Sequence, residues 1–419
     1  MVQASATAED TAAVRDLAGR AAVAAGVLRR TSDDAIDAAL RAAADLLTAR
    51  GQILLEANEA DLSAASAAGL SQSLRDRLRL DPPRLHAMAD QIRTLIDAYA
   101  PIPDRLVRVL GDGRRVTERR VPVGVIGAIF EARPNVVVDV ATQVLRARSA
   151  AVLRTGAAAL TSSTALVDHV LLPALTGAGL PADAVQLVRS PGHGAADAIL
   201  MQPDLIPLVV VRGSGPVTRH LAGVGASAGV QVLAHADGGG VLYVDRGADV
   251  AKARQIVLDS LDRLGVCNRL NLLLLDSGLP AAAVDGLLSA LSEAGVAASM
   301  APHVHPLGQE WALKGGAEAT VTVGTVDSPE QAARIADHET SGLAAAVCAE
   351  DEAVFRRFLD NYGGTAALWN SSTRLVDGYR LLGLAETGIN VDRSLGPRGP
   401  VTYLDLAMRQ YVVLPPATG

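Results

Sequence analysis

The chain has 419 residues, of which 49% are hydrophobic but only 3% aromatic, and its formal net charge is −7. This length predicts two or three domains, with cores built mainly from Ala, Val and Leu. The acidic balance excludes the basic footprint of a nucleic-acid-binding protein. Two cysteines cannot form a disulfide framework, and we find neither a signal peptide nor an apolar run long enough to span a membrane. We therefore expect a cytoplasmic α/β protein.

The first part of the chain is predicted to be helical. Residues 8–100 are rich in Ala, Leu and Arg, with apolar residues at helical spacing. The pattern changes near residue 106, where residues 105–110 and 114–122 flank Gly111-Asp112-Gly113, a sequence typical of a β-hairpin turn. A two-stranded arm is marginal by itself, so we expect it to pack against something else, such as another subunit.

Residues 123–245 alternate between strand-like and helical segments. Helices are expected at 161–175 and 216–228, and strands at 123–130, 150–154, 184–189, 206–212, 230–235 and 241–244. This alternation predicts a parallel sheet covered on both faces. Such sheets bind ligands at the carboxyl ends of their strands.

A second α/β unit is predicted after residue 245. It begins with a helix at 249–264, a loop containing Cys267, and a buried strand at 270–275. Further on we expect a helix at 280–294, strands at 319–326, 343–348 and 365–369, and a final extended segment at 410–414.

Cys267 is the candidate nucleophile because a loop between a helix and a core strand can expose a side chain and also hold it still. Cys348 lies inside an apolar run and is expected to be a small buried hydrophobe, which is also the alternative for Cys267. A thiolate that attacks an acyl carbon creates an oxyanion that needs donors. The amide of Asn135, after the strand at 123–130, can supply one; alternatively, Asn135 caps a helix.

Two strand ends carry candidate phosphate-binding turns. One has the sequence Arg212-Gly213-Ser214-Gly215, but Thr218 occupies the sixth position of the glycine-rich pattern, so the match is incomplete. The other is Arg154-Thr155-Gly156. The segment 235–240 is either a loop beside a cofactor or a turn between strands. No metal site is expected, because the histidines lack ligand spacing.

Several segments together resemble the γ-glutamyl phosphate reductase family of the aldehyde dehydrogenase superfamily. They are GVCN at 265–268, VPVGVIGAIFEARPNVVVDVA at 121–141, VVVRGSGPVTRHL at 209–221, HADGGGVLYVD at 235–245, WNSSTRLVDG at 369–378 and RGPVTYLDLAMRQYVV at 398–413. Their order and spacing match the family over about residues 35–413, which is more specific than any single motif.

The resemblance implies an aldehyde-dehydrogenase-like fold. A Rossmann-like cofactor domain is expected from residues 1–105 and 122–245, and a catalytic domain from 246–375. Residues 106–121 and 376–419 are expected to form an oligomerisation element and C-terminal segment, giving a homo-oligomer, either a dimer or a tetramer.

The implied activity is the NADPH-dependent reduction of γ-glutamyl phosphate to glutamate 5-semialdehyde in proline biosynthesis. Cys267 would be the nucleophile and Asn135 the oxyanion donor, with an amino-acid kinase as a possible partner that supplies the substrate. The implied cofactor residues are Arg154, Thr155, Gly156, Arg212, Gly213, Ser214, Gly215, Asp237 and Gly238. The implied substrate residues are Arg133, Asn268, Asn370, Ser371, Ser372 and Thr373, and no metal is implied.

The chain also departs from the family pattern around the expected site. Polar or charged residues of the family are replaced by Ser260 and Asn271, and further departures fall at Gly240, Val241 and Gly396. These changes are compatible with a paralogous reductase of a related or carrier-bound acyl phosphate. They are equally compatible with a general NAD(P)-dependent aldehyde dehydrogenase or with a non-catalytic partner of a kinase. Retention of Cys267 and Asn135 argues against the non-catalytic partner.

Overall fold

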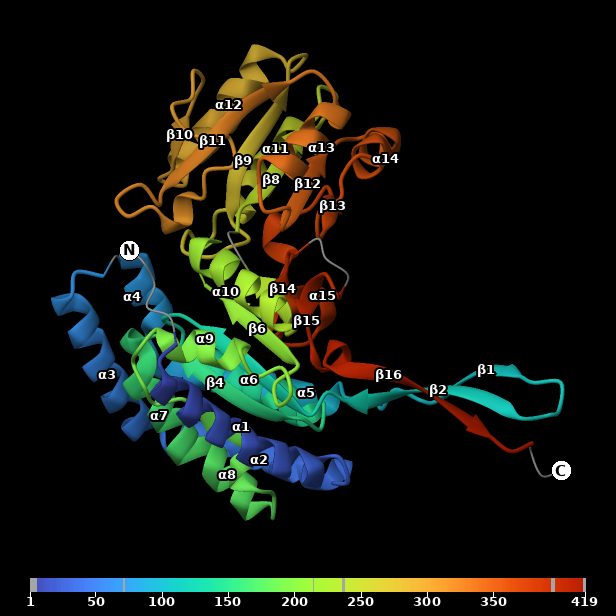
Figure 1. The fold of residues 1–419 in the computed structure, drawn as a ribbon. Coiled ribbons are helices and arrows are strands. Elements are labelled where there is room, and N and C mark those ends of the chain that lie inside the picture. The colour runs from blue at the N-terminus through green and yellow to red at the C-terminus, as the bar shows by residue number, and fades with distance from the viewer. Residues whose placement is uncertain (1–5, 71, 214, 236–237, 393–395, 417–419) are drawn as a thin grey trace.

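A five-stranded parallel sheet forms the centre of the first domain (Figure 1). The computed structural model describes residues 6–416 except 71, 214, 236–237 and 393–395. The strand order is β5-β4-β3-β6-β7. The strands are β3 (Val125–Phe130), β4 (Ala150–Thr155), β5 (Val185–Leu187), β6 (Leu208–Arg212) and β7 (Gln231–His235). Because β3 and β4 are buried along their whole length, they consist of continuous apolar runs rather than alternating ones.

Helices enclose this first sheet. Five come from the N-terminal region: α1 (Ala8–Leu28), α2 (Asp33–Ala49), α3 (Gly51–Ala67), α4 (Gln72–Leu78) and α5 (Pro82–Asp97). The others are α6 (Asn135–Arg146), α7 (Leu160–Leu166), α8 (Leu172–Gly177), α9 (Gly194–Leu200) and α10 (Gly215–Ala228). Side chains define the helix starts, since Ser32 accepts a hydrogen bond from the Ala35 N–H and Asp81 accepts one from the Arg84 N–H.

One helical segment, Ala157–Gly177, is long and apolar enough to cross a membrane, which the sequence analysis did not anticipate. It comprises α7 and α8 with short 3₁₀ and π segments. Within its most apolar window 56% is buried inside the protein, where α7 packs on α3 and α8 packs on α2. This burial is typical of a core helix.

The second domain contains a six-stranded parallel sheet with the order β10-β11-β9-β8-β12-β13. Its strands are β8 (Gly240–Val244), β9 (Leu270–Asp276), β10 (Ala297–Ser299), β11 (Thr320–Val326), β12 (Ala344–Cys348) and β13 (Ala367–Trp369). Its helices are α11 (Val250–Asp259), α12 (Ala281–Glu293), α13 (Pro329–His338) and α14 (Glu352–Leu359).

Two expectations about this domain were wrong in detail. The strand expected at 241–244 pairs with β9 and β12, so the boundary between the two sheets lies before Gly240 and not at residue 245. The helix expected to reach residue 264 ends at Asp259, because the chain then turns and the Ser260 carbonyl accepts a hydrogen bond from the Leu270 N–H.

The predicted hairpin projects from the body as an arm (Figure 1). It consists of β1 (Arg105–Val109) and β2 (Arg115–Pro122), and β16 (Ala407–Leu414) adds a third antiparallel strand along β2. The turn closes as expected, with Gly113 at φ +84°. Before the arm, α15 (Gly378–Leu382) precedes a small pair, β14 (Gly388–Asn390) and β15 (Gly399–Val401), which lies beside β7.

Candidate active site

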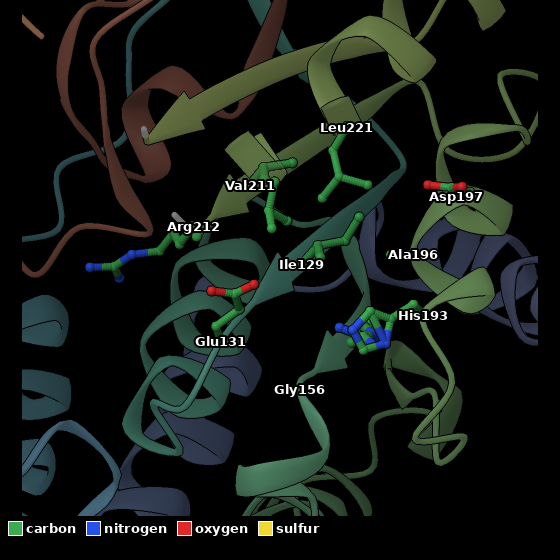
Figure 2. Close-up of a pocket in the computed structure, with 12 residues that line it drawn as sticks. Ile129, Glu131, Gly156, His193, Ala196, Asp197, Val211, Arg212 and Leu221 are labelled. Carbon is green, nitrogen blue, oxygen red and sulfur yellow. The ribbon is translucent and has the colours of Figure 1, made fainter. Parts of the chain in front are cut away.

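The carboxyl edge of the first sheet forms a pocket (Figure 2). Arg154 and Gly156 approach it from the end of β4, Glu131 follows β3, and Arg212 and Gly213 lie at the end of β6. In Figure 2 the apolar side chains of Ile129, Val211 and Leu221 gather in its middle, while Arg212 extends away from them. Polar groups on an apolar floor at this edge are suited to a nucleotide.

Two polar groups near this pocket have unused hydrogen-bonding capacity. Arg154 donates from Nη2 to the Gly192 carbonyl at 2.9 Å, but its buried Nε has no partner among the described residues. The hydroxyl of the neighbouring Thr155 is also buried without a partner there. Gly213 lies 3.5 Å from the Glu131 carboxyl carbon, measured from the position a Cβ would occupy, and Gly215 begins α10. Ser214 and Asp237, also expected to bind the cofactor, lie outside the described residues.

Cys267 lies just before the amino end of β9 and is partly exposed. The Gly239 N–H donates to the Cys267 carbonyl at 2.5 Å. A Cβ built on Gly238 would lie 2.5 Å from both the Cα and the Cβ of Cys267, so this position has no room for a side chain. Gly238 therefore supports the cysteine loop directly and lines a separate cleft with residues such as Thr218 and Ser341. Cys348 is fully buried as expected, and burial raises the pKa of its thiol to about 12.

A second segment holds the cysteine loop from the other side. The Thr373 hydroxyl donates to the Asn268 carbonyl at 2.8 Å, and the Ser372 and Ser260 hydroxyls are 3.0 Å apart. The buried Asn268 amide donates to the Val376 carbonyl at 3.1 Å and accepts from Arg374. These expected substrate residues thus make structural contacts, and Ser371 is partly buried nearby.

Asn370 is not placed where the resemblance implied. Its amide bonds both backbone groups of Ala349, which follows the carboxyl end of β12. Cys267 precedes the amino end of β9, and all strands in this sheet are parallel. Asn370 consequently lies toward the opposite edge of the sheet from the cysteine and joins β13 to β12 instead of lining the cleft.

Asn135 begins α6, and its side chain makes no capping bond, so the capping alternative is wrong. Its Nδ2 instead donates to Asp139 Oδ2, one turn along the helix, at 2.9 Å. This contact fixes the orientation of the amide, because only the NH₂ end can donate to a carboxylate. Burial raises the pKa of Asp139 to about 7, which the nearby Arg212 opposes and Glu386 reinforces.

Arg77 is a site residue that the sequence analysis missed. It lies on α4, and its Nε donates to the Gly265 carbonyl at 3.0 Å, two residues before Cys267. Burial lowers its pKa, and the charges of Cys267 and Glu310 oppose that shift. Arg133 lies in the same group, where burial and the guanidinium groups of Arg212 and Arg77 lower its pKa to about 9. Nothing in the local sequence of α4 places Arg77 beside the cysteine.

The departures from the family pattern are distributed unevenly. Asn271 bonds the Gln309 carbonyl at 2.6 Å and the Trp311 N–H at 3.1 Å, and so holds the loop that carries Glu310. Val241 is buried in β8. Gly240 has no room for a side chain against Thr373. Gly396 is exposed beside β7, with its nearest neighbours 3.9 Å from a Cβ position.

The comparisons with known proteins agree with this geometry. The model of the aldehyde dehydrogenase family, whose members use nicotinamide cofactors, matches residues 2–307. A γ-glutamyl phosphate reductase of Kineococcus radiotolerans is 38% identical, covering 96% of this chain and 95% of that protein, and one of Sphingopyxis alaskensis is 36% identical, covering 97% and 95%. The crystal structure of γ-glutamyl phosphate reductase from Thermotoga maritima is 27% identical, with a TM-score of 0.85 over 95% of this chain and 97% of that one.

Proposed function

Because the chain belongs to the γ-glutamyl phosphate reductases of the aldehyde dehydrogenase family, we propose that it reduces γ-glutamyl phosphate to glutamate 5-semialdehyde and phosphate, using NADPH and a thioester on Cys267. The observation that carries the proposal is the position of Cys267. The only partly exposed cysteine stands between the nucleotide-suited edge of the first sheet and a group of arginines suited to an anionic substrate.

The cysteine chemistry needs no activated water. The Cys267 thiolate bonds to the acyl carbon while the bond from that carbon to the phosphate oxygen breaks, and phosphate leaves with its electron pair. NADPH, when bound, supplies the hydride that reduces the thioester carbon. The oxyanion then collapses, the carbon–sulfur bond breaks, and the aldehyde leaves while Cys267 returns as thiolate. The departing phosphate takes a proton from solvent.

Asn135 and the cysteine loop would stabilise the charge that develops on the acyl oxygen. One Nδ2 hydrogen of Asn135 is held by Asp139, so the other is free to point toward the reacting oxygen. The contacts of Gly238, Thr373 and Arg77 hold the backbone on either side of Cys267. Fixed donors of this kind stabilise an oxyanion without reorganising during the reaction.

Arg154 supports NADPH over NADH. It lies in the wall of the nucleotide pocket with an unused buried Nε, and a guanidinium suits a phosphate group such as the one that distinguishes NADPH. We expect Arg154→Gln to raise the KM for NADPH about tenfold or more, with a much smaller effect for NADH. Equal effects on both cofactors would contradict this role.

The test of the activity is consumption of NADPH with γ-glutamyl phosphate generated in situ by an amino-acid kinase. We expect turnover by the wild type and by Cys348→Ala, and none by Cys267→Ala with unchanged NADPH binding. Iodoacetamide should label native Cys267 far faster than Cys348, whose thiol is buried and has a raised pKa. Turnover by Cys267→Ala, or oxidation of simple aldehydes without phosphate as the faster reaction, would contradict the proposal. Association with the kinase and a cytoplasmic location remain predictions.

A further inference from the structure

Two arginines of the cleft lie near Cys267 without a carboxylate partner. In the part of the chain that the structure describes, neither Arg77 nor Arg133 forms an ion pair, whereas their neighbours Arg263 and Arg212 do. Arg77 uses only Nε in its hydrogen bond to Gly265, so its two terminal NH₂ groups remain available. Both side chains are partly buried, and withdrawing a cation from water is costly unless an anion joins it.

The position of Arg77 is fixed by elements that otherwise belong to different domains. The preceding residue, Asp76, accepts from Arg84 at 2.7 Å and from Arg263 at 2.8 Å, so it ties α4 both to the N-terminal helices and to the cysteine loop. The bond from Arg77 to Gly265 then adds a second link two residues from the nucleophile. Arg77 is therefore held in place before any substrate arrives.

The charges around the cysteine match a free amino acid. Arg77 and Arg133 supply two cations, and Glu310, whose side chain is within electrostatic reach of Arg77, supplies one anion. γ-Glutamyl phosphate carries a phosphate, an α-carboxylate and an α-ammonium group. The other arginines that might compensate for Ser260 are occupied, since Arg269 bonds three backbone carbonyls and Arg374 bonds Asp262 and Asn268.

We propose that Arg77 is a specificity-determining residue that binds an anionic group of the substrate, the phosphate or the α-carboxylate, and that the protein therefore takes the acyl phosphate of a free amino acid and not a carrier-bound one. This inference rests on the proposed reduction of γ-glutamyl phosphate. It replaces the expectation, drawn from Ser260, Asn271 and Gly396, that the site had lost its charged partners.

The reverse reaction separates the two anions, because phosphate and glutamate 5-semialdehyde then enter as different reactants with NADP⁺. We expect Arg77→Gln to raise the KM of one of them about ten- to hundredfold, the effect of one charge-assisted contact. A rise for phosphate identifies the leaving group as the ligand, and a rise for the semialdehyde, absent with butanal, identifies the carboxylate. Arg77→Lys should recover part of the loss. Arg79→Gln, an exposed neighbour, is the matched control.

A second measurement does not depend on turnover. Inorganic phosphate or L-glutamate should slow iodoacetamide labelling of Cys267 in the wild type, and much less in Arg77→Gln. If both KM values stay within about twofold of the wild type while only kcat falls, or if the anions protect both proteins equally, Arg77 merely holds the Gly265 loop and the inference is wrong. A wild type that forms no NADPH from the semialdehyde and phosphate refutes the proposed function instead, and the labelling comparison still decides the role of Arg77.

Discussion

Adding one methyl group at Gly238 should displace the nucleophile without unfolding the protein. The Cβ of Gly238→Ala would lie 2.5 Å from both the Cα and the Cβ of Cys267, whereas ordinary contact begins near 3.4 Å. The cysteine loop must therefore move by about 1 Å, because most of the atoms that the methyl meets are backbone or Cβ and cannot rotate away. Gly238 does not have a left-handed φ, so alanine itself is compatible with the backbone there.

A displacement of about 1 Å at a reacting atom costs roughly a hundredfold in rate. We expect the kcat of Gly238→Ala to fall by about that factor, and its stability to fall by about 1–3 kcal/mol, the usual range for overpacking. The assays are NADPH consumption, iodoacetamide labelling of Cys267, and thermal unfolding. Gly223→Ala is the matched control, because a Cβ there meets nothing within 4 Å. A kcat within about threefold of the wild type, with an unchanged labelling rate, would refute the reasoning.

Three further results are expected. Asn135→Ala should lower kcat by about a hundredfold or more, the usual effect of losing one oxyanion donor, and an unchanged kcat would leave the amide no catalytic role. Light scattering at micromolar concentration should give at least a dimer, because Tyr411 and Val413 on the arm are each 54% exposed; a monomeric mass would reject this. Finally, the pKa of Asp139, raised by burial from its usual value near 4 to about 7, means that the folded state binds the extra proton. The free energy of unfolding should thus lose a contribution as pH rises from about 4 to 7, and Asp139→Asn should remove this loss; parallel pH profiles of the two proteins would contradict it.

Local patterns in the sequence were sufficient to predict most elements, but not how the strands combine into sheets. Alternating apolar runs identified the strand at Gly240–Val244, yet its short connection to β7 suggested one continuous sheet. Its partners, β9 and β12, come later in the chain, so only the three-dimensional pairing shows that it belongs to the second domain. The same limitation affected the helix before Cys267. Apolar spacing continues past Asp259, but the backbone turns there to pair Ser260 with Leu270.

The site divides in a similar way. Cys267, Asn135 and Arg154 were identified because each lies next to a strand or helix boundary that the sequence itself indicates. Asn370 was misplaced because a motif gives an order along the chain and not which edge of the sheet each member reaches. Arg77 could not be found from its neighbours, since its role comes from a contact with Gly265, 188 residues away.

The contacts around Cys267 also explain why the family departures need not abolish catalysis. The nucleophile is positioned through backbone atoms: the carbonyls of Gly265, Cys267 and Asn268 accept hydrogen bonds from Arg77, Gly239 and Thr373. These contacts require no charge at Ser260, whose hydroxyl bonds the 372–373 segment instead. Changing a charged residue to Ser260 or Asn271 therefore alters what the cleft can recognise more than where the sulfur lies. Substrate charge must then be matched by residues outside the altered set, and Arg77 and Arg133 lie in position to do so.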